Sequence, residues 1–172
     1  MKILVISDNH GDQAILEKVF THFHDTVDAI FHCGDSEMAV TNPLFDDVQV
    51  VKGNNDYGTT FADDVSVQVG TDQVFMTHGD LYGVNMGLTH LSLKAQEMGA
   101  TLVFYGHTHQ LAAEFVQGRL YLNPGSISLP RGEFANLGGT FAIVTTMADQ
   151  LQVDFYDRQL KRVSSLHQVF SR

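Results

Sequence analysis

The segment that decides the fold is MKILVISDNH, residues 1–10. Lys2 to Ile6 is a short apolar and β-branched run, which predicts a strand buried on both faces. Asp8 and His10 follow, so a carboxylate and an imidazole stand where the predicted strand ends. Ligands of α/β proteins bind at this edge of the sheet, where loops converge on rigid strands. The segment therefore predicts an α/β fold with a polar site at the end of its first strand.

The same arrangement recurs four times further along the chain. In each case an apolar run stops at a short cluster of glycine, aspartate, asparagine or histidine. These clusters are His32-Cys33-Gly34-Asp35, Gly53-Asn54-Asn55-Asp56, Thr77-His78-Gly79-Asp80 and Gly106-His107-Thr108-His109. Any one of them alone is also typical of an ordinary turn. Five clusters that each follow a predicted buried strand favour a shared functional site.

The donor atoms in these clusters suit divalent metal ions of intermediate hardness. Carboxylate, imidazole and amide donors bind manganese, iron, zinc or nickel in proteins. Asp35 carries two carboxylate oxygens and could therefore bridge two ions. Gly34, Gly53 and Gly106 allow the tight backbone turns that bring such ligands together. The clusters therefore predict a metal site.

The periodicity of the remaining sequence predicts two sheets with helices outside them. Asp12 is expected to cap a helix over 13–23, and a second helix is expected over 87–98. Further strands are expected over 29–33, 48–51, 66–69, 73–77, 101–105, 112–116, 119–122, 139–146 and 151–157. Strands and helices alternate at first, whereas the last third of the chain is mostly antiparallel. Two sheets packed face to face with helices outside account for this mixture.

Length and composition restrict the classes of protein to consider. The 172 residues, 44% of them apolar, predict a single domain over residues 1–172. Twenty acidic against ten basic residues give a net charge of −10, which argues against a nucleic-acid binder or a polybasic membrane anchor. One cysteine, Cys33, excludes an intramolecular disulfide. No window approaches the roughly 20 apolar residues of a membrane span, so we expect a cytoplasmic protein, and homo-oligomerisation stays open.

In order and spacing, the five clusters resemble those of the calcineurin-like metallophosphoesterases, whose pattern runs D-x-H, G-D, G-N-H-[DE], H and G-H-x-H. The match spans Asp8 to His109. The small size and Asn123-Pro124-Gly125-Ser126 resemble a compact bacterial and archaeal phosphodiesterase branch, which is related to the eukaryotic retromer scaffold subunit. The resemblance implies a four-layer α/β/β/α sandwich of two mixed sheets flanked by helices, in agreement with the strand pattern.

The resemblance also implies two divalent metal ions, with manganese expected and nickel, iron(II) or zinc as alternatives. It places Asp8, His10, Asp35 and His109 on the first ion, and Asp35, Asn54, His78 and His107 on the second. The implied reaction is hydrolysis of small or activated phosphodiesters by a hydroxide that bridges the two ions. Asn55 and Asp56 are then expected to be catalytic residues on the substrate side of the second ion.

Two residues depart from the family pattern. Asn55 stands where the family has a histidine thought to protonate the leaving group, a contribution of roughly 10²–10⁴-fold. Its loss favours substrates with good leaving groups, such as aryl esters. Asp80 stands where members of the branch often carry a second histidine. Because the retromer subunit also lacks the first histidine, Asn55 motivates an alternative, a weakly active or inactive protein-binding scaffold, which the complete ligand set disfavours.

A few polar residues stay open between structural and functional roles. His32 could contact the metal ligands, and Arg131 could clamp a substrate at the rim. Asn123 and Ser126 fit either a phosphate-binding rim or an ordinary turn. Cys33 is interpreted as a small buried strand residue rather than as a ligand or nucleophile.

Overall fold

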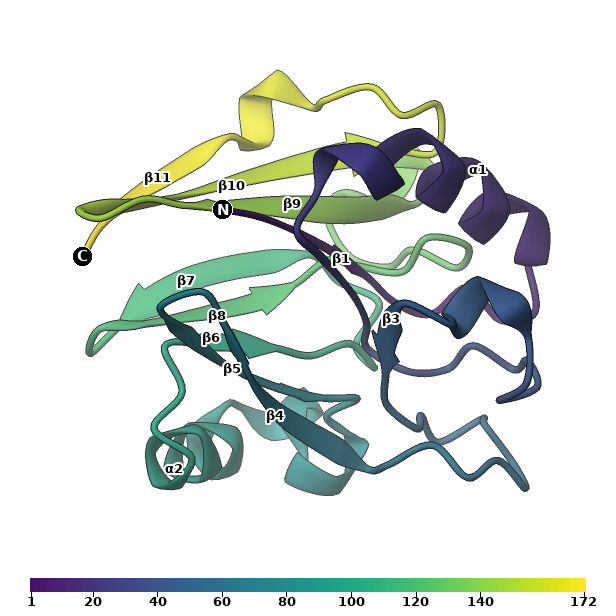
Figure 1. The fold of residues 1–172 in the computed structure, drawn as a ribbon, viewed down its shortest axis with the longest axis horizontal. Coiled ribbons are helices and arrows are strands. Elements are labelled where there is room, and N and C mark those ends of the chain that lie inside the picture. Colours follow the sequence, from purple (N-terminus) through teal and green to yellow (C-terminus); the bar gives the residue numbers. More distant parts are fainter.

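The chain folds into two facing β-sheets with one α-helix on the outside of each (Figure 1). This computed structural model describes residues 1–172. The first sheet, in the order β11-β10-β9-β1-β2-β3, contains β1 (Lys2–Ile6), β2 (Ala29–His32), β3 (Val48–Val50), β9 (Thr140–Thr146), β10 (Gln150–Asp157) and β11 (Gln168–Ser171). The second, in the order β4-β5-β6-β8-β7, contains β4 (Asp64–Val69), β5 (Asp72–Thr77), β6 (Leu102–Phe104), β7 (Ala112–Val116) and β8 (Arg119–Asn123). The helices are α1 (Gln13–Phe23) and α2 (Thr89–Glu97).

Three clusters of buried apolar side chains hold four layers together. The cluster between the sheets includes Phe31 and Phe104, whose rings meet edge to face with centroids 5.4 Å apart. A second cluster joins the first sheet to α1 through residues such as Leu16 and Phe20. The third joins the second sheet to α2, where Leu91 is fully buried. The four-layer α/β/β/α sandwich of two mixed sheets is therefore confirmed.

Parallel pairing brings together the carboxyl ends of the strands that precede the polar clusters. In the first sheet β1 pairs in parallel with β2, and β2 with β3. In the second sheet β5 pairs in parallel with β6, and β6 with β8. The five polar clusters follow β1, β2, β3, β5 and β6. They therefore lie at the carboxyl ends of parallel strands in both sheets.

The loop after β1 is fixed at the beginning of α1, as the sequence predicts. The side chain of Asp12 accepts a hydrogen bond from the backbone N–H of Ile15 at 3.2 Å and so caps the helix. The same carboxylate pairs with the guanidinium of Arg158 at 2.7 Å. These contacts anchor both the helix and the short segment that carries the first polar cluster.

The predicted strands form within two residues of their expected bounds, and two other elements differ for a physical reason. The second helix begins at Thr89 rather than at residue 87, because Gly87 has a φ of 124°, which is outside the helical range. Strand β11 was not predicted. It contains only four residues, which alternate between half-buried and exposed, and it forms by pairing with β10. Its conformation thus depends on a neighbour that its own short pattern does not reveal.

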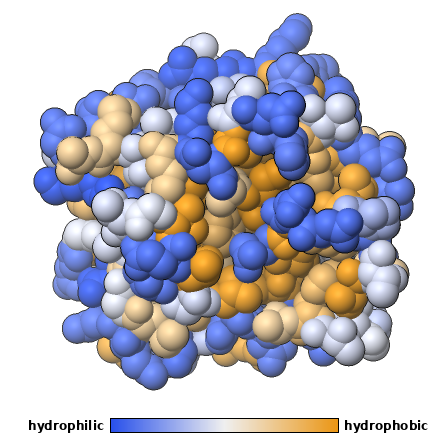
Figure 2. All heavy atoms as spheres, in the orientation of Figure 1, coloured by the Kyte–Doolittle hydropathy of each residue, from blue (hydrophilic) through white to orange (hydrophobic).

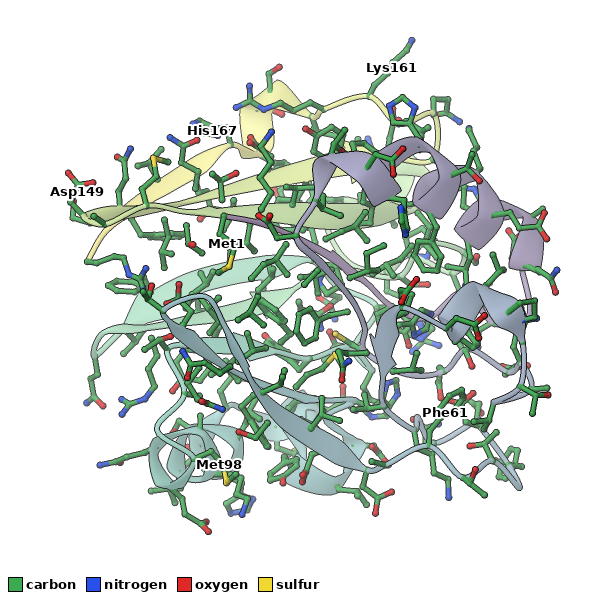
Figure 3. The ribbon with its side chains drawn as sticks, viewed as in Figure 1. Met1, Phe61, Met98, Asp149, Lys161 and His167 are labelled. Atoms are coloured by element: carbon green, nitrogen blue, oxygen red, sulfur yellow. The ribbon has the colours of Figure 1, made fainter.

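Apolar side chains also reach the surface along the seam between the sheets. Figure 2 shows them gathered over the middle of one face, with hydrophilic groups around and partly over them. Met1 is one half-buried member, and its side chain points from the start of β1 into the space between the sheets (Figure 3). None of the helices combines the length and apolar character needed to cross a membrane.

Candidate metal centre

Five loops meet at the carboxyl ends of the parallel strands and bring all seven predicted metal ligands into one site. They are the loops after β1 (Asp8, His10), β2 (Asp35), β3 (Asn54), β5 (His78) and β6 (His107, His109). Three of these strands belong to the first sheet and two to the second. The site therefore forms only when the two sheets pack face to face.

The ligands predicted for the first ion lie together. Donor atoms of Asp8, His10, Asp35 and His109 are all within 4.8 Å of one another. Nε2 of His109 is 3.2 Å from Oδ1 of Asp8 and 3.3 Å from Nε2 of His10. Two carboxylates and two imidazoles in such a group form a donor set for a divalent transition metal.

The hydrogen bonds of the Nδ1 atoms determine the tautomer of each imidazole, and therefore whether its Nε2 faces the site with a lone pair. Nδ1 of His109 donates to the backbone carbonyl of Leu129 at 2.7 Å, and Nδ1 of His10 lies 2.6 Å from Oε1 of Glu37. With a proton on each Nδ1, both Nε2 atoms present lone pairs. Two lone pairs only 3.3 Å apart repel unless a cation lies between them. The two rings therefore fit a bound metal ion.

Asp8 gives a second, independent test of that fit. Its side chain is fully buried, and neither carboxylate oxygen accepts a hydrogen bond. An ionised carboxylate without hydrogen-bond partners is costly inside a protein. A cation bound at this position would satisfy both oxygens. The residues present therefore match the requirements of a metal ion.

The ligands predicted for the second ion converge on the amide oxygen of Asn54. Nδ1 of His107 lies 2.7 Å from this oxygen, and Nε2 of His78 lies 3.1 Å from it. Nδ1 of His78 donates to the backbone carbonyl of Cys33 at 2.7 Å, so Nε2 is the nitrogen that faces the site. The same Nε2 is 3.5 Å from Oδ2 of Asp35, which also belongs to the first group. Asp35 thus lies between the two groups, where a bridging ligand is expected.

The close packing of carboxylates and imidazoles shifts their pKa values. Burial alone would lower the pKa of His78, but Asp35 and Asp8 outweigh it and raise that pKa to about 9. Burial alone would raise the pKa of Asp35, but contact with His78 holds it well below its usual range. At His109 the carboxylate of Asp8 likewise outweighs burial and raises the pKa. Because metals bind the neutral imidazole, a metal ion bound here would displace protons from these histidines.

The backbone at the ligands is strained. Eight non-glycine residues have positive φ, and five of them are the predicted ligands Asp8, His10, Asp35, His107 and His109. Such left-handed conformations cost of order 1–3 kcal/mol each and cluster at functional sites. Gly53 is also required by space, because a Cβ there would clash with Oδ1 of Asp35. The loops are therefore shaped around the ligand positions at a cost in stability.

The two predicted catalytic residues contact other parts of the site. Nδ2 and the backbone N–H of Asn55 both donate to the carboxylate of Asp35, at 2.6 and 2.7 Å. Asp56 is buried, and its oxygens accept from the backbone N–H groups of Glu37 and Gly53 at 2.6 and 2.8 Å. Asn55 thus holds the shared carboxylate, and Asp56 ties the loops after β2 and β3 together. Their catalytic roles stay predictions.

The last residue of β8, Asn123, and Ser126 just beyond the strand support the ligand loops from below the surface. Asn123 and Ser126 are fully buried. The side-chain amide of Asn123 donates to the carbonyl of Gly106, and Oγ of Ser126 donates to the carbonyl of Asp8, each at 2.8 Å. Their burial argues for bracing of the loops rather than for a phosphate-binding rim.

The other residues left open by the sequence fall in different positions. Cys33 is buried in the core between the sheets, where burial raises its pKa, as expected of a structural residue. His32 is buried too, and its Nε2 lies 2.9 Å from Oδ1 of Asn9 rather than beside a predicted ligand. Arg131 is exposed, and its backbone N–H donates to the carbonyl of His109 at 2.9 Å. Asp80 is half-buried after β5.

Two contacts to ligand imidazoles were missed by the sequence analysis. Glu37 contacts His10, and Nδ2 of Asn85 lies 2.8 Å from Nε2 of His107. Glu37 carries a usable signal, since it is a carboxylate two residues beyond Asp35 in the same cluster-bearing loop. Asn85 carries none, because it lies in a short 3₁₀ turn between β5 and α2 with no recognisable pattern.

The chain resembles known proteins in both sequence and structure. The sequence matches the calcineurin-like phosphoesterase superfamily domain over residues 1–149. It is 36% identical over 166 residues to the probable metallophosphoesterase YsnB of Bacillus subtilis, with 96% of each protein covered. A solved structure from Streptococcus pneumoniae, described as a predicted phosphoesterase, is 37% identical with a TM-score of 0.95, covering 99% of this chain and 97% of that one. Vacuolar Protein Sorting 29 from Cryptosporidium parvum shares the fold at 17% identity, with a TM-score of 0.71 over 99% of this chain and 98% of that one.

Proposed function

This chain belongs to the calcineurin-like phosphoesterase superfamily and is a metal-dependent phosphoesterase, and we propose that it hydrolyses phosphodiesters with two divalent ions bound. The observation that carries the proposal is the convergence of two groups of donors on Asp35, the first of which contains Asp8, a buried carboxylate whose oxygens accept no hydrogen bond. Manganese is the proposed metal, since the donors mix carboxylate, amide and imidazole. When bound, two ions supply a water of lowered pKa and neutralise charge on phosphoryl oxygens.

The chain's own residues hold and orient the donors for that chemistry. Asp35 is shared by the two groups, and Asn55 fixes both of its oxygens through two hydrogen bonds. Glu37 and the carbonyls of Cys33 and Leu129 occupy Nδ1 of three imidazoles, which leaves each Nε2 directed inward. Contacts of this kind fix the tautomer of a ligand histidine and raise its basicity.

The charges around the site favour a diester over a monoester. A diester carries one negative charge, whereas a monoester carries about −1.5 to −2 near neutral pH. The loops at the ligands carry Glu37, Asp63 and Asp80, against only Lys52 and Arg131 as bases. A chain whose net charge is already −10 lacks the cationic clamp that would favour the dianion. We therefore propose diesters as the substrate class.

The alternative function is a protein-binding scaffold of the same fold. The likeness to Vacuolar Protein Sorting 29 is a likeness of fold alone. A scaffold has no use for strained backbone at five predicted ligand positions or for a buried carboxylate whose oxygens accept no hydrogen bond. These features favour the enzyme.

The test is diester hydrolysis by metal-free protein that is reloaded separately with manganese, nickel, zinc or magnesium. We expect bis(4-nitrophenyl) phosphate to be cleaved far faster than a dialkyl diester, because Asn55 cannot protonate the leaving group and a general acid is worth roughly 10²–10⁴-fold. Asp35→Ala should lose both ions and the activity, whereas Leu93→Ala on the exposed surface of α2 should keep both.

Two results would contradict this proposal. Protein that carries two ions per chain but cleaves no diester would favour the scaffold. Two ions retained by Asp35→Ala would show that Asp35 does not bridge. Equal rates for aryl and alkyl diesters would show instead that another residue supplies the proton.

A further inference from the structure

Exposed apolar side chains surround the metal centre. Eight large apolar residues are strongly exposed in the whole chain. Five of them lie on segments that carry or contact predicted ligands: Val40, Tyr57, Leu81, Met86 and Leu129. Isolated exposed apolar residues need no explanation, but a concentration around one site indicates a surface that binds something apolar.

Two of these residues line a cavity that begins at the metal ligands. The cavity has a volume of about 310 Å³, and Asn54, Tyr57 and Leu81 all form part of its wall. Tyr57 lies three residues beyond Asn54, and Leu81 three residues beyond His78, so both follow ligands of the second group. Tyr57 is 83% exposed and Leu81 is 66% exposed. A substituent that extends from a phosphate group placed near Asn54 would therefore contact an aromatic ring and an aliphatic side chain.

The size and charge of the cavity restrict what this group can be. About 310 Å³ is within the range of pockets that hold small organic ligands, so a substituted ring fits. Asp56, Asp63 and Asp80 also line the cavity, against a single base, Lys52. Three carboxylates oppose a second anionic group such as another phosphate. The occupant is therefore expected to be neutral and planar.

We propose that Tyr57 and Leu81 form a subsite for a neutral aromatic ester arm of the substrate, with the ring stacked on Tyr57. This inference rests on the proposed phosphodiesterase function and narrows its substrate class to diesters with at least one aromatic or nucleoside-like arm. Stacking of a planar group on an exposed aromatic side chain contributes about tenfold or more to affinity.

The test compares two monoanionic phosphonates that differ only in the group on phosphorus. Methyl phenylphosphonate and methyl methylphosphonate are titrated into manganese-loaded protein, and their dissociation constants are measured by calorimetry. We expect the phenyl compound to bind about tenfold more tightly. Tyr57→Ala should bring the ratio close to one, Leu81→Ala should reduce it, and Tyr57→Phe should preserve it. Leu93→Ala is the matched control, because Leu93 is 61% exposed on α2 and lines none of these surfaces.

Metal content and hydrolysis of bis(4-nitrophenyl) phosphate are measured on the same preparations. Equal affinity for the two phosphonates in the wild type, or an unchanged ratio in Tyr57→Ala, overturns the subsite, and continued hydrolysis would leave the proposed function standing. Absence of hydrolysis together with an aryl preference that depends on Tyr57 overturns the function and supports the subsite. Dimers in the wild type that dissociate in Tyr57→Ala, measured by sedimentation, would show that Tyr57 contacts a second copy of the chain and overturn the subsite.

Discussion

Glu37, in the loop after β2, links the loops that follow β1 and β3. Its carboxylate lies 2.6 Å from Nδ1 of His10, and its own backbone N–H donates to Asp56 at the same distance. Glu37 also has a positive φ of 52°, so its backbone is held in a strained conformation that keeps this position. Asp56 is therefore connected to His10 through Glu37, and these contacts indicate a positioning function for this buried aspartate.

Replacement of Glu37 tests this link. Glu37→Gln removes the negative charge that orients and polarises His10, so we expect metal affinity at the first group to fall about 10–100-fold. The affinity is measured by calorimetric titration of manganese into metal-free protein. Glu17→Gln is the control, since Glu17 is an exposed acid on α1 away from the ligands. Unchanged affinity in Glu37→Gln would show that His10 is positioned without it.

His32 gives the protein a stability that depends on pH. Burial lowers the pKa of His32 to about 4, whereas a histidine of the unfolded chain titrates near 6.5. The unfolded chain therefore binds the proton more tightly, so stability is full above about pH 6.5 and is lost as the pH falls toward 4. The loss from this residue should reach about 3 kcal/mol.

The measurement is urea unfolding of metal-free protein between pH 7 and pH 4, for the wild type and for His32→Gln. The pH dependence of the free energy of unfolding is compared between the two proteins. Because both contain the same carboxylates, the difference gives the contribution of His32. A proton NMR titration that finds His32 of the folded protein titrating above pH 6 would contradict the expectation.

At the scale of elements, the strand ends explain why so much of the fold and the site could be predicted. A buried parallel strand such as β1 carries a local signal, an apolar run that stops at polar residues. Each ligand follows such a strand by a few residues, so its position in the chain also gives its position in the fold. The same reasoning fails for β11, which forms only through pairing with β10.

The contacts between loops could not be predicted in the same way. The interactions of Asp56 with Glu37 and of Asn85 with His107 join segments 19 and 22 residues apart. No period or spacing marks such pairs, because they depend on where the loops lie after the sheets pack. Sequence therefore indicated the candidate metal ligands, and the structure was needed for the residues that position them.

At the scale of the whole molecule, the arrangement of the site lowers the stability of the metal-free fold. Asp8, just beyond the end of β1, is buried although its carboxylate oxygens accept no hydrogen bond. Five ligands adopt left-handed backbone conformations in the same region. Both features raise the free energy of the metal-free folded state. A ligand that binds only the folded state stabilises that state by mass action and so offsets this cost.

Metal removal should therefore lower the stability of the whole chain. At a free manganese concentration 100 times the dissociation constant, one bound ion adds about 2.7 kcal/mol, which for a domain of this size raises Tm by roughly 2–4 °C per kcal/mol. Thermal unfolding is followed by circular dichroism with manganese and with an excess of chelator. The increase in Tm should grow with the logarithm of the metal concentration, because each tenfold increase above the dissociation constant adds the same free energy. Asp35→Asn should lose this response because both groups share Asp35, whereas Leu93→Ala should retain it. A Tm that is the same with metal and with chelator, or an undiminished response in Asp35→Asn, would show that these loops are stable without the ions and that their strain has another cause.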